Sequence, residues 1–117
     1  MTPLAEWTVE FYTDVRGRNP VLEFVDSLPK REQAKVFRVL TLLQEYGPLL
    51  SMPHVRPIER GLWELRGGAG RIFYFAYTGR RFILLHGYLK KTQEAPRREI
   101  EAAQRRMADF MEREGAK

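Results

Sequence analysis

The sequence predicts an α+β fold: a compact single domain over residues 1–117, with a four-stranded antiparallel sheet, helices packed on it and the element order β-α-α-β-β-β-α. Two observations lead to this prediction. The chain of 117 residues is 44% apolar, which is enough for one core and too much for a disordered chain. Along the chain, segments with the apolar period of a strand alternate with segments that have the period of a helix.

The chain opens with a strand pattern and a short helix pattern. Apolar and polar side chains alternate over residues 7–12, which is the period of a half-buried strand. Asn19 is a favourable N-cap and Pro20 a favourable first helical residue. The apolar spacing that follows, i, i+3, i+4 and i+7, predicts a helix over 20–28.

A second helix is predicted over residues 30–46, with a buried apolar seam. It ends at Gly47, which can adopt the left-handed conformation of a C-terminal cap, and the proline after it cannot continue the helix. Residues 49–60 contain Pro53 and Pro57 and are predicted to form a loop.

Three short strands are predicted next, over residues 62–66, 71–77 and 81–88. Glycine-rich turns at 67–70 and 78–79 separate them, which favours an antiparallel meander. A single amphipathic strand is not stable alone, so the strand at 7–12 is expected to join the meander as its fourth strand.

The last predicted element is a helix over residues 96–113, which opens at Pro96. We expect the apolar stripes of all three helices to cover one face of the sheet. Arg105 and Arg106 on this helix are balanced by nearby acids and are interpreted as part of a solvated face.

The charge of the chain is concentrated in residues 60–91. The whole chain has a formal charge of +5, whereas this segment carries seven basic side chains against the single acid Glu64 and the remainder is −1. Such a segment favours a polyanion-binding surface, although basic side chains at strand edges also discourage aggregation. The basic residues are Arg60, Arg66, Arg71, Arg80, Arg81, Lys90 and Lys91.

Several classes of site are excluded by composition. Cysteine is absent and the two histidines lie 32 positions apart, so a zinc site is not expected. One acid in the basic segment is too few for paired-carboxylate catalysis or a cluster of divalent ions. Residues 67–70 lack the Lys-Ser/Thr of a phosphate-binding loop. No cofactor or metal is therefore expected.

The sequence shows no membrane signal. Its longest apolar run, residues 72–77, is far too short for a membrane span, and the N-terminus has neither a basic start nor an apolar signal core. A cytoplasmic location without membrane contact is the simplest expectation.

A metal-free basic site can still cut RNA, because the 2′-hydroxyl is an internal nucleophile. A base removes its proton, cations stabilise the charge that grows on the phosphorane, and an acid protonates the leaving oxygen. His86 follows an apolar run and has a second interpretation as a core histidine, and alternation places it on the face of Tyr88. The residues with suitable chemistry are Arg66, Arg71, His86, Tyr88, Lys90 and Lys91.

Three segments together resemble the RelE/HigB-like toxins, and more narrowly the phage-derived host-killing branch of that superfamily. They read LWELR at 62–66, GRIFY at 70–74 and LLHGYLKKTQ at 84–93, and are followed by Pro96, Glu99 and Ile100. The resemblance spans residues 62 to about 107, and the two preceding helices also fit.

The resemblance implies the toxin of a type II toxin–antitoxin pair with a twisted antiparallel sheet packed against helices. It further implies a ribosome-dependent endoribonuclease that cuts mRNA and so inhibits translation. The implied partners are the ribosome, mRNA and a cognate antitoxin encoded alongside, often a helix-turn-helix protein. Two other functions stay open: a non-catalytic RNA- or ribosome-binding module, and a regulatory protein that binds an antitoxin-like partner.

The resemblance also suggests roles for individual residues. Arg66 and Arg71 match the basic residues that hold the phosphate. The lysine pair, Lys90 and Lys91, or His86 is expected to transfer protons, and Tyr88 to orient the RNA or stack on it. The arginines nearer the turns, Arg60, Arg80 and Arg81, are expected to extend the RNA-binding surface.

Overall fold

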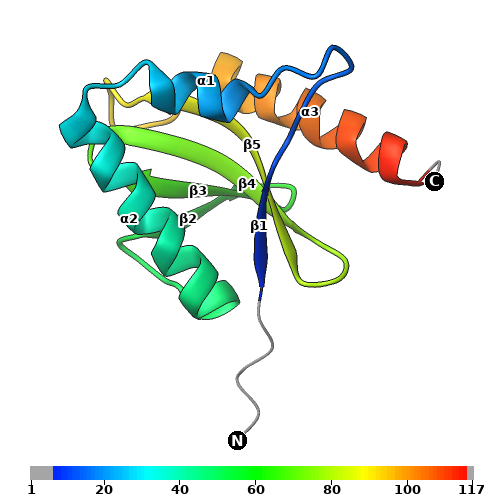
Figure 1. The fold of residues 1–117 in the computed structure, drawn as a ribbon, viewed down its shortest axis with the longest axis horizontal. Helices are drawn as coiled ribbons and strands as arrows, with labels where there is room; N and C mark the ends of the chain where they lie inside the picture. Colours follow the sequence, from blue (N-terminus) through cyan, green and yellow to red (C-terminus); the bar gives the residue numbers. More distant parts are fainter. Residues whose placement is uncertain (1–6, 116–117) are drawn as a thin grey trace, which may run out of the picture.

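The computed structural model describes residues 7–115 as three α-helices, one 3-10 turn and one five-stranded sheet (Figure 1). The elements are β1 (Thr8–Phe11), α1 (Pro20–Asp26), α2 (Lys30–Tyr46), η1 (Gly47–Leu49), β2 (Val55–Glu59), β3 (Leu62–Gly67), β4 (Gly70–Tyr77), β5 (Arg81–Leu89) and α3 (Arg97–Gly115). No helix among them is long and apolar enough to cross a membrane.

The sheet is mixed, with strand order β1-β5-β4-β3-β2. Strands β2 to β5 form an antiparallel meander, whereas β1 pairs with β5 in parallel. The prediction of four antiparallel strands is therefore wrong in number and in one direction. After β1 the chain passes through α1 and α2 and enters the sheet at the far edge, in β2. The meander then returns across the sheet, and β5 runs beside β1 in the same direction.

The fifth strand, β2, occupies part of the segment predicted as a loop. It pairs only with β3 and forms one edge of the sheet. Proline removes a backbone donor, which an edge strand tolerates, and the register shifts between Pro57 and Glu59. Pro57 thus lies in an edge strand, where the sequence-based prediction interpreted it as a loop residue, whereas Pro53 lies in the turn before the strand.

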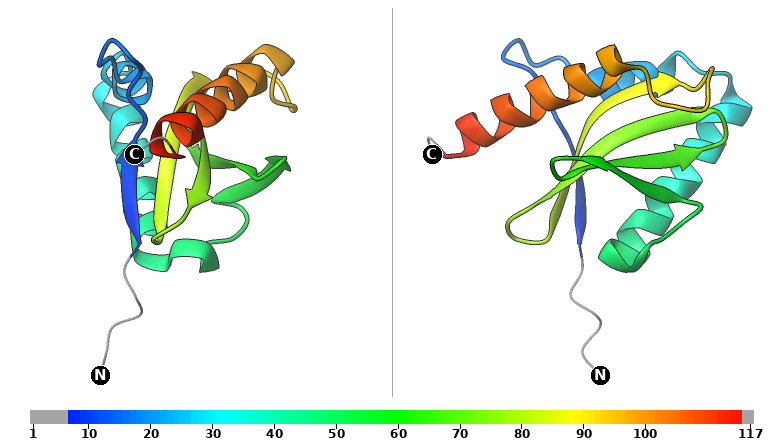
Figure 2. Two further views of the ribbon diagram at one scale, coloured as in Figure 1. Left: turned by 90° about the vertical axis from the view of Figure 1, so that its right-hand side faces the viewer. Right: turned by 180° about the vertical axis from the view of Figure 1, so that it is seen from behind.

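Helices cover both faces of the sheet, so the prediction that they share one face is wrong. Helices α1 and α2 lie on one side and α3 on the other (Figure 2). The reason lies in β4, where Ile72 and Tyr74 face α1 and α2 while Phe73 and Phe75 face α3, and all four are buried. A strand that is apolar on both faces needs cover on both.

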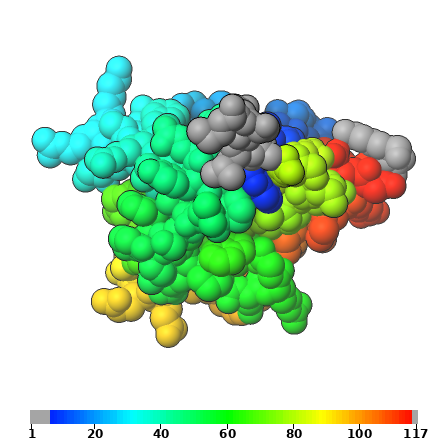
Figure 3. Space-filling model, turned by 90° about the horizontal axis from the view of Figure 1, so that it is seen from below, coloured from blue at the N-terminus to red at the C-terminus, as the bar shows by residue number. Residues whose placement is uncertain are grey.

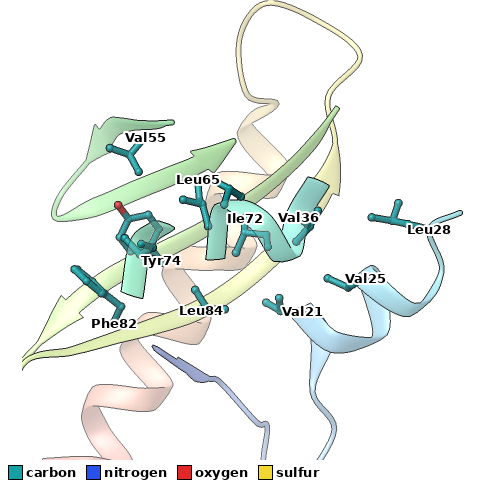
Figure 4. Close-up of a cluster of buried hydrophobic side chains, with 12 residues drawn as sticks. Val21, Val25, Leu28, Val36, Val55, Leu65, Ile72, Tyr74, Phe82 and Leu84 are labelled. Carbon is teal, nitrogen blue, oxygen red and sulfur yellow. The ribbon is translucent and has the colours of Figure 1, made fainter. Parts of the chain in front are cut away.

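The first core lies between the sheet and helices α1 and α2 (Figure 4). Asn19 accepts the Leu22 amide N–H at 3.0 Å, which confirms it as the N-cap of α1. Helix α1 packs closely on β5, because a Cβ at Gly87 would lie only 2.3 Å from Phe24 Cδ2. The residues of this core shown in Figure 4 include Val21, Val25, Val36, Val55, Leu65, Ile72, Tyr74 and Leu84.

The second core lies beneath α3, which contributes the buried residues Ile100 and Ala103. Here β5 contains a bulge: Phe73 pairs with His86 and Tyr74 with Leu84, which leaves Leu85 without an opposite residue. Both Leu85 and His86 therefore face α3. The prediction that His86 shares a face with Tyr88 is confirmed.

Candidate active site

One end of the sheet, where the β3–β4 turn meets the end of β5, gathers most of the predicted site residues. Arg66 lies opposite Arg71, and Arg71 lies opposite Tyr88. Residues directly opposite one another share a face, and Tyr88 belongs to the core beneath α3, so all three side chains lie on the α3 face. The Lys90 amide N–H donates to the Ala69 carbonyl at 2.8 Å, which brings the lysine pair to the same end.

A buried polar network lies at the centre of this site. Glu64 and Arg71 are the buried charged residues among those described, with 3% and 5% of their surfaces exposed. The Tyr88 hydroxyl donates to Glu64 Oε2 at 2.9 Å, and Arg71 Nε lies 3.9 Å from Glu64 Oε1. Arg71 Nη1 donates to the carbonyls of Gly68, at 2.7 Å, and Gly70, at 3.0 Å.

The remaining guanidinium nitrogen of Arg71, Nη2, is available to a ligand. It makes no hydrogen bond within residues 7–115. It is also not fully buried, because Arg113 Nε is the one side-chain atom there that is both fully buried and without a hydrogen bond. Burial lowers the pKa of the guanidinium, and the nearby charge of Arg66 lowers it further, while Glu64 opposes the shift. Arginine nevertheless stays charged at neutral pH, so Nη2 offers charged donors.

Tyr88 is oriented within the site and has little free surface. Only 7% of the residue is exposed, and its ring centroid lies 5.4 Å from that of Phe73 and 6.4 Å from that of His86. Burial, and then the hydrogen bond to Glu64, raise the pKa of its hydroxyl above the ordinary value, so the hydroxyl is a donor at neutral pH. This geometry suits orientation of the site better than stacking on a base.

Four cations without a carboxylate partner among the described residues lie on the same face or at the same end of the sheet as the buried network. Strand β2 adds Arg56, which was not among the predicted site residues; it lies opposite Glu64 and hence on the same face as Arg66. Within residues 7–115, no carboxylate comes within 4.0 Å of either guanidinium. The same holds for Lys90 and Lys91, of which Lys91 is exposed. The site can therefore attract an anion through several unneutralised side chains.

His86 is held by α3 on both sides of its ring. Arg106 Nη1 lies 2.7 Å from Nδ1, and Nε2 lies 2.7 Å from Glu99 Oε1. Arginine can only donate, so we assign Nδ1 as the acceptor and place the proton on Nε2, which donates to Glu99. Burial lowers the pKa of the imidazole and the charge of Arg106 adds to this, whereas the hydrogen bond that Nε2 donates to Glu99 opposes the shift. The ring is therefore neutral at pH 7 and fully engaged.

Arg106 is not part of a solvated face, and the sequence-based interpretation of this residue is wrong. Besides contacting His86, it donates from Nη1 to the Leu85 carbonyl at 3.1 Å. Because of the bulge in β5, both Leu85 and His86 face α3, and Arg106 can contact the carbonyl of the first and the ring of the second. Arg105, its neighbour, is exposed as expected.

Three predicted RNA-binding residues lie away from this site. Arg81 is at the opposite end of β5 from Lys90, about 25–30 Å along a nine-residue strand. It donates to Glu10 at 2.6 Å and pairs with Glu114 at 3.0 Å, so its charge is neutralised. The β4–β5 turn and the segment after β5 emerge on different sides of the molecule (Figure 3). Arg60 and Arg80 occupy turns with left-handed backbone, φ 50° and 59°.

The sequence matches a known protein family over residues 23–108, which is well over half of the 117 residues. The matching model is described as that of the phage-derived protein Gp49-like family. The chain belongs to this Gp49-like family. The match confirms the resemblance to a phage-derived branch that the three strand segments indicate.

Solved structures share the fold of this Gp49-like chain. One is a chain of the toxin–antitoxin complex RelBE2 from Mycobacterium tuberculosis, with 21% identity, a TM-score of 0.53, and coverage of 74% of this chain and 100% of the other. Another belongs to the archaeal RelE–RelB complex from Pyrococcus horikoshii OT3, with 20% identity, a TM-score of 0.55, and coverage of 71% and 93%. The predicted RelE-like fold is thus confirmed. No curated protein matches the sequence.

Clustered metal ligands are absent from the described part of the Gp49-like chain. Along the part of the chain that the structure describes, no three His, Asp or Glu side chains come together in a way that could hold a metal ion. The chemistry that the site can supply is therefore that of guanidinium, ammonium, phenol and carboxylate groups.

Proposed function

We propose that this Gp49-like protein is the toxin of a type II toxin–antitoxin pair and acts as a ribosome-dependent, metal-independent mRNA endoribonuclease. Support comes from membership of a phage-derived family and from a fold shared with chains of toxin–antitoxin complexes. Fold alone does not define an activity, so the argument depends on the site.

The observation that carries the proposal is the set of cations, unpaired among the described residues, that share one face and one end of the sheet with Arg71. A scissile phosphate carries negative charge, and the phosphorane formed when the 2′-hydroxyl attacks carries more. Arg56, Arg66 and the free Nη2 of Arg71 converge on one face. Such donors, fixed before the reaction, stabilise the charge that develops in the transition state. Arginine is especially suited to hold two phosphate oxygens at once.

Proton transfer in this proposal belongs to Lys90 and Lys91. His86 is the conventional candidate, but both of its ring nitrogens have partners on α3. The Tyr88 hydroxyl is engaged by Glu64. The lysines lie at the end of β5, and neither has a carboxylate partner among residues 7–115.

The proposed partners follow from the same argument. The proposed substrate is mRNA presented by the ribosome in the cytoplasm, and the proposed restraint on the toxin is a cognate antitoxin, a helix-turn-helix protein encoded alongside. The two solved complexes pair RelE with RelB, which supports a protein partner of this kind.

Induced expression of the chain alone tests the proposal. We expect growth arrest, relief by co-expression of the neighbouring small gene, and new mRNA 5′ ends that cluster within codons. The variant R66A/K90A should lose both effects, whereas R105A, which removes an exposed arginine on α3, should remain toxic. Normal growth at high soluble expression of the intact chain contradicts a toxin function.

A non-catalytic binding module is the second candidate, and one observation favours it. The two residues most often used to move protons or stack on bases, His86 and Tyr88, are both enclosed. Growth arrest with ribosome binding but without new 5′ ends would select this function.

A further inference from the structure

Glu64 is the acidic side chain of the basic segment, and it lies inside the proposed phosphate site. A carboxylate here repels the anion that the surrounding arginines attract. It is also buried, and burial of a charge is unfavourable unless partners compensate for it. Phosphate binding therefore does not explain why a carboxylate is present here, and Glu64 must have another role.

The two oxygens of Glu64 serve different site residues. Oε2 accepts the Tyr88 hydroxyl at 2.9 Å, and Oε1 lies 3.9 Å from Arg71 Nε. Glu64 thus links β3 to β4 and β5 within one layer of side chains. Because Arg71 Nη1 is held by the Gly68 and Gly70 carbonyls, a negative charge at the Nε side leaves Nη2 as the nitrogen without a protein partner.

We propose that Glu64 is a positioning residue, which holds the Arg71 guanidinium and the Tyr88 hydroxyl so that Arg71 Nη2 faces the scissile phosphate. This inference rests on the proposed function. Glu64 acts through Arg71 and Tyr88 and contacts no substrate. Without the charge of Glu64, the Arg71 guanidinium is expected to contact the bound phosphate in several orientations instead of one. The attack of the 2′-hydroxyl is then expected to slow.

The variant E64Q separates positioning from folding. Glutamine has the same shape and its carbonyl can still accept the Tyr88 hydroxyl, so the fold should be retained, but the charge facing Arg71 is lost. A second variant, Y88F, keeps the carboxylate and removes the hydroxyl. The matched control is E112Q, which changes an exposed glutamate on α3.

The first measurement is NMR of the full-length chain and does not depend on activity. We expect the exchange of the Arg71 Nε proton with water to be about tenfold faster in E64Q, because the carboxylate 3.9 Å from Nε holds the guanidinium through its charge and losing that charge is worth about this factor. The Tyr88 ring-carbon signal next to the hydroxyl should shift as well. Unchanged signals for both residues in E64Q would overturn the inference.

The second measurement is single-turnover cleavage of mRNA on ribosomes. E64Q is expected to slow cleavage by about 10- to 100-fold, the scale of a misplaced reacting geometry, with less than a twofold change in ribosome affinity. E112Q should match the original chain. If E64Q moves the NMR signals but cleaves at the original rate, the positioning role is wrong. If the original chain does not cleave at all, the proposed function fails, and the NMR result alone decides whether Glu64 holds the two side chains.

Discussion

The arginines of the site differ in how far they are buried, and this difference sets what each substitution should do. Arg66 is half-exposed and has no carboxylate partner in the described chain, whereas Arg71 is enclosed and faces Glu64. Removing Arg66 takes away a charge that water had partly solvated. Removing Arg71 also leaves the Glu64 carboxylate buried with one partner fewer, which is strongly destabilising.

Alanine substitutions at single site residues should therefore separate catalysis from folding. R66A is expected to lower the cleavage rate by about 10² to 10³ with little loss of stability, by analogy with the loss of one oxyanion donor. K90A or K91A should cost about 10² to 10⁴ if that lysine transfers the proton. R71A should lose both activity and stability. Single-turnover cleavage and thermal unfolding measure the two effects.

Two outcomes would redirect this assignment. H86A is expected to affect stability more than cleavage, so a folded H86A with cleavage abolished would restore His86 as the catalytic group. If R66A, R71A, H86A, K90A and K91A all stay fully active, the active site lies elsewhere. Cleavage that falls only in proportion to ribosome binding would make these residues docking contacts.

Gly87 marks a contact between β5 and α1 that a methyl group would disrupt. A Cβ there would lie 2.3 Å from Phe24 Cδ2 and 2.8 Å from its Cγ, so the ring must move. G87A is expected to lower the free energy of unfolding by about 1–3 kcal/mol, the range for overpacking. Urea unfolding of G87A measures the loss, and F24L/G87A should recover part of it. A fully stable G87A would contradict this close approach.

Some site residues could be predicted from local sequence and others could not. The pairs Arg66–Arg71 and Arg71–Tyr88 follow from a meander with short turns, which the sequence shows directly. The engagement of His86 depends on Glu99 and Arg106, and their approach to β5 depends on a bulge and on the face that α3 covers. Neither the bulge nor the covered face can be predicted from the spacing of charged residues along α3.

At the scale of elements, caps and periodicity predicted α1, α2 and the three central strands to within a few residues. The edge strand β2 has no clear apolar alternation, because it contains Pro57 and its register shifts between Pro57 and Glu59. Recognising that strand would have identified Arg56 as a site residue. The parallel pairing of β1 is non-local and depends on how the α1–α2 connection crosses the sheet. The apolar run of β4 did contain the signal for a second covered face.

Polar contacts join helix α3 to the sheet in addition to its apolar core, and His86 makes one of them sensitive to pH. Besides the His86 pairs, the Tyr12 hydroxyl donates to Asp109 at 2.6 Å, and Arg97 donates to Glu59. The folded state resists protonation of His86, because burial and Arg106 lower its pKa. The unfolded chain takes up the proton near pH 6.5, the ordinary histidine value.

The free energy of unfolding should therefore fall as pH decreases from about 7.5 to 5, since the unfolded state binds more protons in that window. Protonation would also replace the Arg106–Nδ1 hydrogen bond by repulsion between two donors. The carboxyl groups whose pKa values are lowered, such as Asp109, act at lower pH, around 4 and below. Thermal unfolding across this range should show the loss in the original chain and in the control H54Q. H86Q should be flatter, and an equal slope in H86Q would contradict the assignment.

At the scale of the whole molecule, the fold divides its basic segment into two parts with different roles. One end of the sheet carries unpaired cations around Arg71, whereas the other end uses Arg81 to join β5, β1 and α3 through Glu10 and Glu114. The positive potential is therefore stronger at the site, and weaker at the opposite end, than an even distribution of the net charge of +5 would give. An RNA strand should be attracted toward one end of the sheet, with an affinity that falls as salt increases.

The same distribution of charge predicts how the reaction proceeds. Within residues 7–115 the site offers cations and one buried carboxylate, with no cluster of metal ligands. In the proposed reaction, stabilisation of the phosphorane would depend on arginine and lysine, and the nucleophile would be the RNA's own 2′-hydroxyl. Cleavage should persist in a chelator at concentrations that leave ribosomes intact, and the upstream product should end in a 2′,3′-cyclic phosphate or a 3′-phosphate. Substrates with a 2′-deoxy sugar at the cut position should resist cleavage, because they lack the nucleophile. Mass spectrometry of the product ends decides the point: 3′-hydroxyl ends would require an external water nucleophile and a different catalytic centre.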